Sequence, residues 1–204
     1  IHSPLDTSSA ASPLARLIMA TPDSEPVVLT VGHSTRPLAD FIDLLKAHKV
    51  VRLIDVRTVP RSRHNPQYNI DALPDALFAE GIAYEHVAGL GGFRKAHPES
   101  PNTGWRNVSF RGYADYMQTP EFAEHLAKLI VAAWRERIAL MCAGAVPWRC
   151  HRSLIADALV VHGLRVEEII SRSRRQVHRL TPFARVNGMA ITYPPDAVSG
   201  KGAV

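Results

Sequence analysis

The chain has 204 residues, of which 46% are hydrophobic and 21% are charged, a composition typical of one well-packed globular domain. No stretch approaches the roughly 18 consecutive apolar residues of a transmembrane helix, so we expect no membrane contact and a cytoplasmic protein. The net charge of +5 favours anionic partners, and two cysteines are too few for a disulfide framework.

The first 26 residues are rich in Ser, Pro and Ala, and we expect them to form a flexible leader outside the fold. After them, short apolar runs predict strands, and apolar residues recurring three and four positions apart predict helices. In the helix expected over 71–80, Leu73, Leu77 and Phe78 are predicted to face inward. The predicted strands are 27–31, 50–56, 82–87, 138–142 and 166–170, and the predicted helices are 37–48, 71–80, 113–117, 120–135 and 153–162.

This alternation predicts an α/β fold, namely a single three-layer domain over 27–170. We expect a mostly parallel sheet of about five strands with helices on both faces, because parallel strands need long crossovers that cover both sides. Residues 171–204 are expected to form a basic C-terminal extension. Its arginines are Arg172, Arg174, Arg175, Arg179 and Arg185.

In such a fold the strand-to-helix loops open at one edge of the sheet, where α/β proteins bind ligands. The loops assigned to 32–36, 57–69, 88–110 and 142–152 hold nine Lys and Arg but only one acid, Glu99. That excess predicts a crevice for a phosphate-bearing small molecule or nucleic acid. The residues predicted to bind it are Ser34, Arg57, Arg61, Ser62, Arg63, Asn65, Asn69, Gly91, Gly92, Arg149, His151 and Arg152.

Four residues at this edge are candidates for catalysis: Cys142 at a strand end, Cys150 just before a helix, and His33 and Asp55 after two other strands. Cys150 is expected to be the more acidic thiol, because a helix N-terminus and neighbouring basic groups stabilise a thiolate. Each candidate also has a structural interpretation. The cysteines can be small buried hydrophobes, His33 can fix a loop, and Asp55 can pair with Arg57.

The cysteine spacing argues against two familiar kinds of site. A Cys-x7-Cys-His arrangement matches no standard zinc pattern, so we expect no metal and leave the cofactor open. Phosphatases place Arg six residues after the nucleophilic Cys, whereas Arg149 lies seven residues after Cys142. Phosphatase-like chemistry and sulfur transfer therefore stay minor alternatives.

Six segments together resemble the domain-of-unknown-function 488 family, over about residues 27 to 170. They are TVGHS (30–34), LIDVR (53–57), PRSRHNPQYN (60–69), LGG (90–92), WRNVSFRGYADYM (105–117) and MCAGAVPWRCHRSLIADAL (141–159). The resemblance supports the fold and the crevice and implies no particular reaction. This chain has Gly144 where the family pattern usually has Glu, and Glu167 and Glu168 where it has a histidine. A lost carboxylate would alter any activity that uses it.

The leading hypothesis is an enzyme with a basic, cysteine-containing crevice that acts on a phosphate-bearing ligand, either a nucleotide or a nucleic-acid end. The alternative is a non-catalytic nucleic-acid-binding or accessory module whose arginines contact phosphates and whose cysteines are structural. Thiol reactivity distinguishes the two hypotheses. The sequence assigns no substrate and no oligomeric state.

Overall fold

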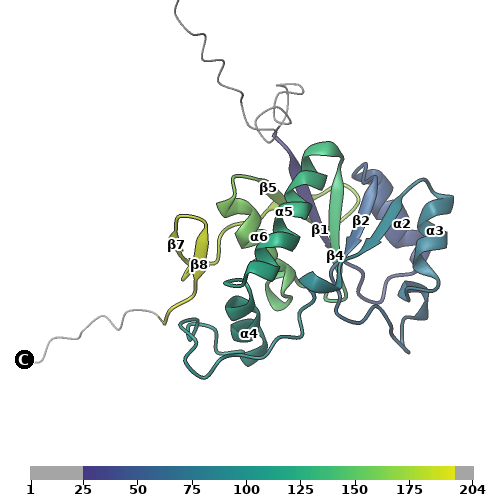
Figure 1. The fold of residues 1–204 in the computed structure, drawn as a ribbon. Helices are drawn as coiled ribbons and strands as arrows, with labels where there is room; N and C mark the ends of the chain where they lie inside the picture. The colour runs from purple at the N-terminus through teal and green to yellow at the C-terminus, as the bar shows by residue number, and fades with distance from the viewer. Residues whose placement is uncertain (1–24, 196–204) are drawn as a thin grey trace, which may run out of the picture.

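The computed structural model describes residues 25–195 (Figure 1). Its six-stranded sheet has the strand order β3-β2-β4-β1-β5-β6. Neighbouring strands are parallel except for the antiparallel pair of β5 and β6. The α/β prediction is confirmed, and the sheet has one strand beyond the five expected. The strands are β1 (Val27–Gly32), β2 (Arg52–Asp55), β3 (Ala83–His86), β4 (Ile138–Cys142), β5 (Arg165–Ile169) and β6 (Arg175–Val177).

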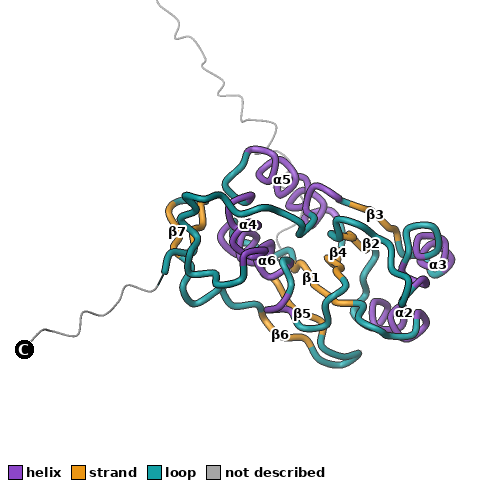
Figure 2. The backbone as a smooth tube through the Cα atoms, turned by 90° about the horizontal axis from the view of Figure 1, so that it is seen from below, coloured by secondary structure: helices purple, strands orange, loops and turns teal. Residues whose placement is uncertain are grey.

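Helices cover both faces of the sheet (Figure 2). On one face lie α2 (Leu38–Ala47) and α3 (Leu73–Ala79), and on the other lie α4 (Val108–Tyr116), α5 (Pro120–Arg135) and α6 (Arg152–Val161). No helix among the described residues combines the length and apolar character that crossing a membrane requires. Three short 3-10 turns sit in loops: η1 (Pro66–Tyr68), η2 (Ala88–Leu90) and η3 (Pro147–Arg149).

The central strand β4 is buried along its whole length, and its side chains alternate between the two faces. Ala139 and Met141 pack with α2 and α3, while Leu140 and Cys142 pack with the helices of the other face. The Cys142 side chain therefore points toward the side of the sheet that carries α6.

Two helix predictions need correction. Phe78 is 83% exposed, because Leu73 and Leu77, four positions apart, share the buried face and the next residue is rotated about 100° from it. Helix α4 begins at Val108, five residues before the predicted start. The Asn107 side chain caps it by accepting a hydrogen bond from the Ser109 amide.

The C-terminal segment returns to the domain instead of leaving it. After β6, residues 185–192 form a hairpin of β7 (Arg185–Asn187) and β8 (Ala190–Thr192), with Gly188 in the left-handed region at φ +59°. The Gln118 side chain donates to the Ile191 carbonyl and so ties β8 to α4 and α5. The predicted leader, up to residue 24, and the end of the extension, 196–204, lie outside the described residues.

His178 follows β6 and is buried between two carboxylates, one from α6 and one from β5. Its Nε2 lies 2.8 Å from Asp157 Oδ1, and its Nδ1 lies 3.2 Å from Glu168 Oε1. Burial alone lowers the pKa of His178, but the hydrogen bonds to Asp157 and Glu168 outweigh it and raise the pKa to about 9. The imidazolium therefore fastens the C-terminal segment to the domain at neutral pH.

The carboxyl ends of the central strands meet at one edge, where the strand registers pair Gly32 with Cys142 and Asp55 with Met141. The His33 and Ser34 amides continue the pairing, donating to the Cys142 and Ala143 carbonyls. The fold therefore brings the predicted site loops to the same place.

Candidate functional site

A cavity of about 400 Å³ opens at this edge, above the end of β4. Six of the predicted site residues line it: Arg57, Gly92, Cys142, Arg149, Cys150 and His151. The rest of its wall is formed by Thr58, Val59, Phe93, Asn107, Ser109, Phe110, Ala143 and Gly144.

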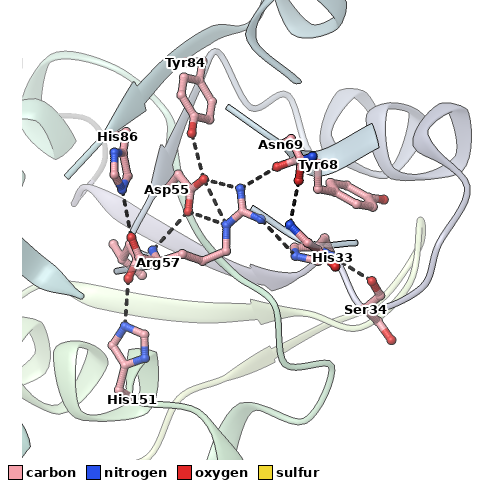
Figure 3. Close-up of polar contacts among 11 residues, drawn as sticks. His33, Ser34, Asp55, Arg57, Tyr68, Asn69, Tyr84, His86 and His151 are labelled. Carbon is pink, nitrogen blue, oxygen red and sulfur yellow. Dashed lines mark hydrogen bonds and ion pairs between the residues drawn. The ribbon is translucent and has the colours of Figure 1, made fainter. Parts of the chain in front are cut away.

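Both cysteines are free and converge on one nitrogen of His151. Cys142 Sγ lies 4.0 Å and Cys150 Sγ 3.8 Å from His151 Nδ1. His151 Nε2 is 2.9 Å from the Val56 carbonyl, which only accepts hydrogen bonds, so Nε2 carries the proton (Figure 3). In the neutral ring Nδ1 is consequently an acceptor, and its lone pair faces the two thiols.

Local structure fixes this arrangement on both sides. Cys142 ends β4, and the chain returns through η3, so that Cys150 lies two residues before the start of α6, with His151 as the N-cap. Gly92 packs against the His151 ring, since a Cβ at Gly92 would lie 2.5 Å from Nδ1. Only glycine leaves room for the ring at this position. Gly92, predicted to bind a ligand, thus also supports a side chain of the site.

The two thiols differ in acidity because they share a hydrogen bond in a buried place. The pKa of Cys150 is lowered because the Cys142 thiol donates to its sulfur, with further contributions from His151 and Arg152. The pKa of Cys142 is raised, first by that same bond and then by burial. The direction for Cys150 is the one expected from the sequence, while its reactivity stays a prediction.

Next to the cavity, Asp55 and Arg57 form a buried ion pair (Figure 3). Arg57 Nε lies 2.9 Å from Asp55 Oδ1, Nη2 lies 2.5 Å from Oδ2, and the Arg57 amide donates to Oδ1 at 3.0 Å. The Tyr84 hydroxyl donates to the same carboxylate at 2.8 Å, and Nη2 also donates to the Tyr68 carbonyl at 2.7 Å. Asp55 therefore has its lone pairs occupied by protein donors.

His33 completes this cluster and is fully enclosed. Its Nδ1 donates to the Ser34 carbonyl at 2.7 Å, so Nε2 is an acceptor that faces Arg57 Nη1 at 3.4 Å. The ring stacks on Tyr68 with centroids 4.1 Å apart. Burial, followed by the charge of Arg57, lowers the pKa of His33 and keeps the ring neutral. His33 and Asp55 do not line the cavity.

Several arginines of the predicted basic crevice bind backbone carbonyls instead of facing solvent. Arg152 is 1% exposed and donates from Nη1 to the Gly144 carbonyl at 2.6 Å. Arg36 and Arg94 likewise donate to the Gly32 and Gly89 carbonyls. Arg149, by contrast, is exposed on the cavity wall, so its guanidinium can reach a ligand bound there.

The loop after β2 is stabilised mainly by hydrogen bonds among its own residues. The Ser62 amide donates to Asn69 Oδ1 at 2.7 Å, and the Asn65 amide donates to Ser62 Oγ at 3.1 Å. Arg61 pairs with Asp71 at 3.6 Å on the surface. Other predicted binding residues also lie off the cavity wall: Ser34 takes φ +54° in the β1–α2 turn, Arg63 is exposed, and Gly91 packs on Thr58.

Sequence reasoning missed the apolar part of the wall. Phe93 is 81% and Val59 56% exposed, although both are large apolar side chains in loops that converge on the site. Such residues between predicted elements were the available signal for a ligand surface. The contact of Tyr84 with Asp55 could not be predicted, because tyrosine is common in strands and its presence there does not indicate a site.

At Gly144, a Cβ would lie 3.5 Å from Cys150 Cβ and 3.9 Å from its Sγ, in ordinary van der Waals contact. The glutamate implied by the family resemblance would therefore begin beside Cys150. The two glutamates of β5 have partners of their own: Glu167 pairs with Arg165 and Arg175, and Glu168 with His178.

Comparison with known proteins gives one match. The family model described as "Domain of unknown function DUF488" matches residues 37–159, a range that runs from the start of α2 into α6 and contains both cysteines and His151. No curated protein and no solved structure matches the chain.

Proposed function

The chain belongs to the DUF488 family, and from the geometry of its cavity we propose that it is an enzyme acting through Cys150 on a phosphate-bearing ligand. The ligand class is a nucleotide or a nucleic-acid end. The observation that carries the proposal is the position of Cys150 Sγ, 3.8 Å from His151 Nδ1, the ring nitrogen that is not bonded to the Val56 carbonyl, with both groups on the wall of one cavity.

In this proposal His151 Nδ1 accepts the proton of the Cys150 thiol, and the Val56 carbonyl holds the ring in the tautomer that can do so. The thiolate then forms a bond to the electrophilic centre of the ligand. The bond between that centre and the leaving group breaks, and the leaving group takes the proton of the imidazolium. Water then attacks the same centre and the bond to sulfur breaks, while one proton of the water returns through His151 to Cys150. His33 and Asp55, expected to be catalytic, act here as positioning residues for Arg57 because neither lines the cavity.

The cavity wall supports a nucleotide better than a bare phosphate. Val59, Phe93 and Phe110 offer an apolar and aromatic surface, and Arg149 offers an exposed positive charge on the same wall. A base stacks on aromatic side chains, while a guanidinium binds phosphate oxygens. The volume of about 400 Å³ is within the range of small-molecule sites.

Two measurements on the full chain test the proposal. Iodoacetamide labelling at neutral pH, read by peptide mass spectrometry, should modify Cys150 before Cys142, and Cys150→Ser should abolish the early modification. Calorimetry with a panel of mononucleotides should show binding that Arg149→Ala weakens by about 10- to 100-fold, the loss expected for a charged hydrogen bond. Arg61→Ala is the matched control, because Arg61 pairs with Asp71 outside the cavity.

The non-catalytic binding module is the second candidate, and one observation favours it. Cys142 and Cys150 are only 8% and 6% exposed, as structural cysteines often are. Nucleotide or nucleic-acid binding without labelling of either cysteine in the folded protein would favour this candidate. We place either function in the cytoplasm, because two free neighbouring thiols suit a reducing compartment.

A further inference from the structure

We propose that Cys142, Cys150 and His151 together form a zinc-binding site, with two thiolate sulfurs and the Nδ1 nitrogen as ligands. The inference goes beyond the proposed reaction, because it depends on these three atoms alone and on no assumption about the ligand of the cavity. All three ligand atoms lie within 4.8 Å of one another. Soft thiolates with imidazole are the donor set that Zn²⁺ prefers.

The distances fit a tetrahedral metal. With Zn–S of about 2.3 Å and Zn–N of about 2.0–2.1 Å, a tetrahedral angle separates sulfur from nitrogen by about 3.6 Å. The observed separations are 4.0 Å for Cys142 and 3.8 Å for Cys150. Closing these gaps takes shifts of a few tenths of an ångström, within the reach of side-chain rotation.

His151 is already oriented as a metal ligand. Metal-bound histidines commonly donate their other ring N–H to a carbonyl or carboxylate, which fixes the tautomer and the ring plane. His151 Nε2 donates to the Val56 carbonyl at 2.9 Å, and Gly92 packs against the ring. The lone pair of Nδ1 therefore points at the two sulfurs before any metal arrives.

Charge and access complete the site. Two buried thiolates need a cation, and Zn²⁺ supplies it as both thiols release their protons to solvent on metal binding. The protein provides three ligands, and the cavity borders all three residues, so the fourth position is open to water or to a ligand. A zinc-bound Cys150 is no longer a free nucleophile, so zinc and thiol reagents compete for the same sulfur.

The test uses the full chain, freed of metal by a chelator and titrated with Zn²⁺ by calorimetry. We expect one Zn²⁺ per chain. Co²⁺ in place of zinc should give the intense visible absorption of a tetrahedral site together with thiolate-to-cobalt charge transfer. Cys142→Ser, Cys150→Ser and His151→Ala should each weaken binding by about 100-fold.

Gly92→Ala keeps all three ligands but places a methyl group against Nδ1, so it should weaken Zn²⁺ binding as well. His86→Gln is the matched control, because His86 Nε2 bonds to the Arg57 carbonyl nearby and is not a ligand. This variant should bind Zn²⁺ as the parent does. Circular dichroism of each variant separates lost binding from lost folding.

Saturating Zn²⁺ should also protect Cys142 and Cys150 from iodoacetamide. The inference is overturned by absent binding, by binding that survives both cysteine substitutions, or by unchanged alkylation at saturating Zn²⁺. Arg149→Ala separates it from the proposed function, since this variant should lose nucleotide affinity and keep zinc affinity. Thiol labelling and nucleotide binding without zinc binding would remove the zinc site alone, and the reverse pattern would remove the proposed reaction alone.

Discussion

Two clusters share the carboxyl edge of the sheet and differ in how their polar groups are satisfied. Around Asp55 and Arg57, each charge meets short hydrogen bonds from the protein, with distances of 2.5–3.0 Å. Around Cys142 and Cys150, by contrast, the two sulfur atoms contact His151 Nδ1 at the longer distances of 4.0 and 3.8 Å, and the cluster borders a cavity. In the first cluster the hydrogen-bonding groups are occupied by protein partners and the cluster is closed to a ligand. The second cluster is open, because its sulfur and nitrogen atoms lie at the cavity wall. The first cluster therefore supports the fold, and the second is where we place the proposed chemistry.

Asp55→Ala should give the largest effect, because it leaves the buried guanidinium of Arg57 without its counter-ion. We expect a loss of about 3–5 kcal/mol in the free energy of unfolding, measured by urea denaturation. Asp71→Ala removes an exposed partner of Arg61 and should cost less than about 1 kcal/mol. Equal losses in the two variants would refute the view that the Asp55 cluster supports the fold.

The His178 cluster is a second closed arrangement and should make stability depend on pH. Its folded pKa of about 9 exceeds the usual 6.5, so its stabilisation is complete below about pH 6.5 and is lost as the pH rises through about 9. The expected loss is about 3 kcal/mol between pH 6 and 10.

The measurement is urea denaturation across this pH range for the parent and for His178→Gln, which carries no titrating group at this position. Subtracting the two curves removes the contribution of other residues. Parallel curves would mean that His178 does not hold its proton between Asp157 and Glu168 as the geometry implies.

Cys150→Ser should lower the free energy of unfolding by about 1–2 kcal/mol, less than Asp55→Ala does, because a buried sulfur is exchanged for a hydroxyl while no charge loses its counter-ion. Its effect should instead appear in iodoacetamide labelling, where the early modification disappears. Cys142→Ser is the matched substitution at the end of β4. A loss comparable to that of Asp55→Ala would make Cys150 a structural residue.

Gly144→Ala should have the smallest effect on stability, within about 0.5 kcal/mol, because the added Cβ would make only ordinary contacts with Cys150. The methyl group narrows the approach to the Cys150 sulfur, so labelling should become slower without changing its site. Unchanged labelling kinetics would show that reagents reach Cys150 by another route.

Much of the fold could be predicted, because buried parallel strands are continuous apolar runs, as in Ile138–Cys142. Strand β6 could not be predicted in this way, since all three of its residues are exposed and have no apolar pattern. The hairpin of β7 and β8, by contrast, has a turn that the sequence marks. The two-residue turn is Gly188-Met189, and a glycine at the first turn position is typical of such hairpins.

The location of the site could be predicted, but not which of its residues face the cavity. Strand ends brought Cys142, Asp55 and His33 to one edge, as expected for parallel strands. Which arginines stay free could not be predicted, because Arg152 and Arg149 look alike in sequence, yet one binds the Gly144 carbonyl and the other lines the cavity. The meeting of both thiols at one nitrogen likewise depends on how the loop after β4 folds back.

The strand order also makes the middle of the sheet depend on contacts between distant parts of the chain. β1, near the start of the described chain, pairs with β4 and β5, whose residues follow roughly 110 and 138 positions later, as in Leu29 with Ala139 and Glu167. Contacts of such long range raise the entropic cost of the transition state and slow folding. During synthesis β1 must wait for most of the chain before either neighbour exists. Because Cys142 ends β4, the geometry of the thiol site depends on the pairing of β4 with β1 in the middle of the sheet.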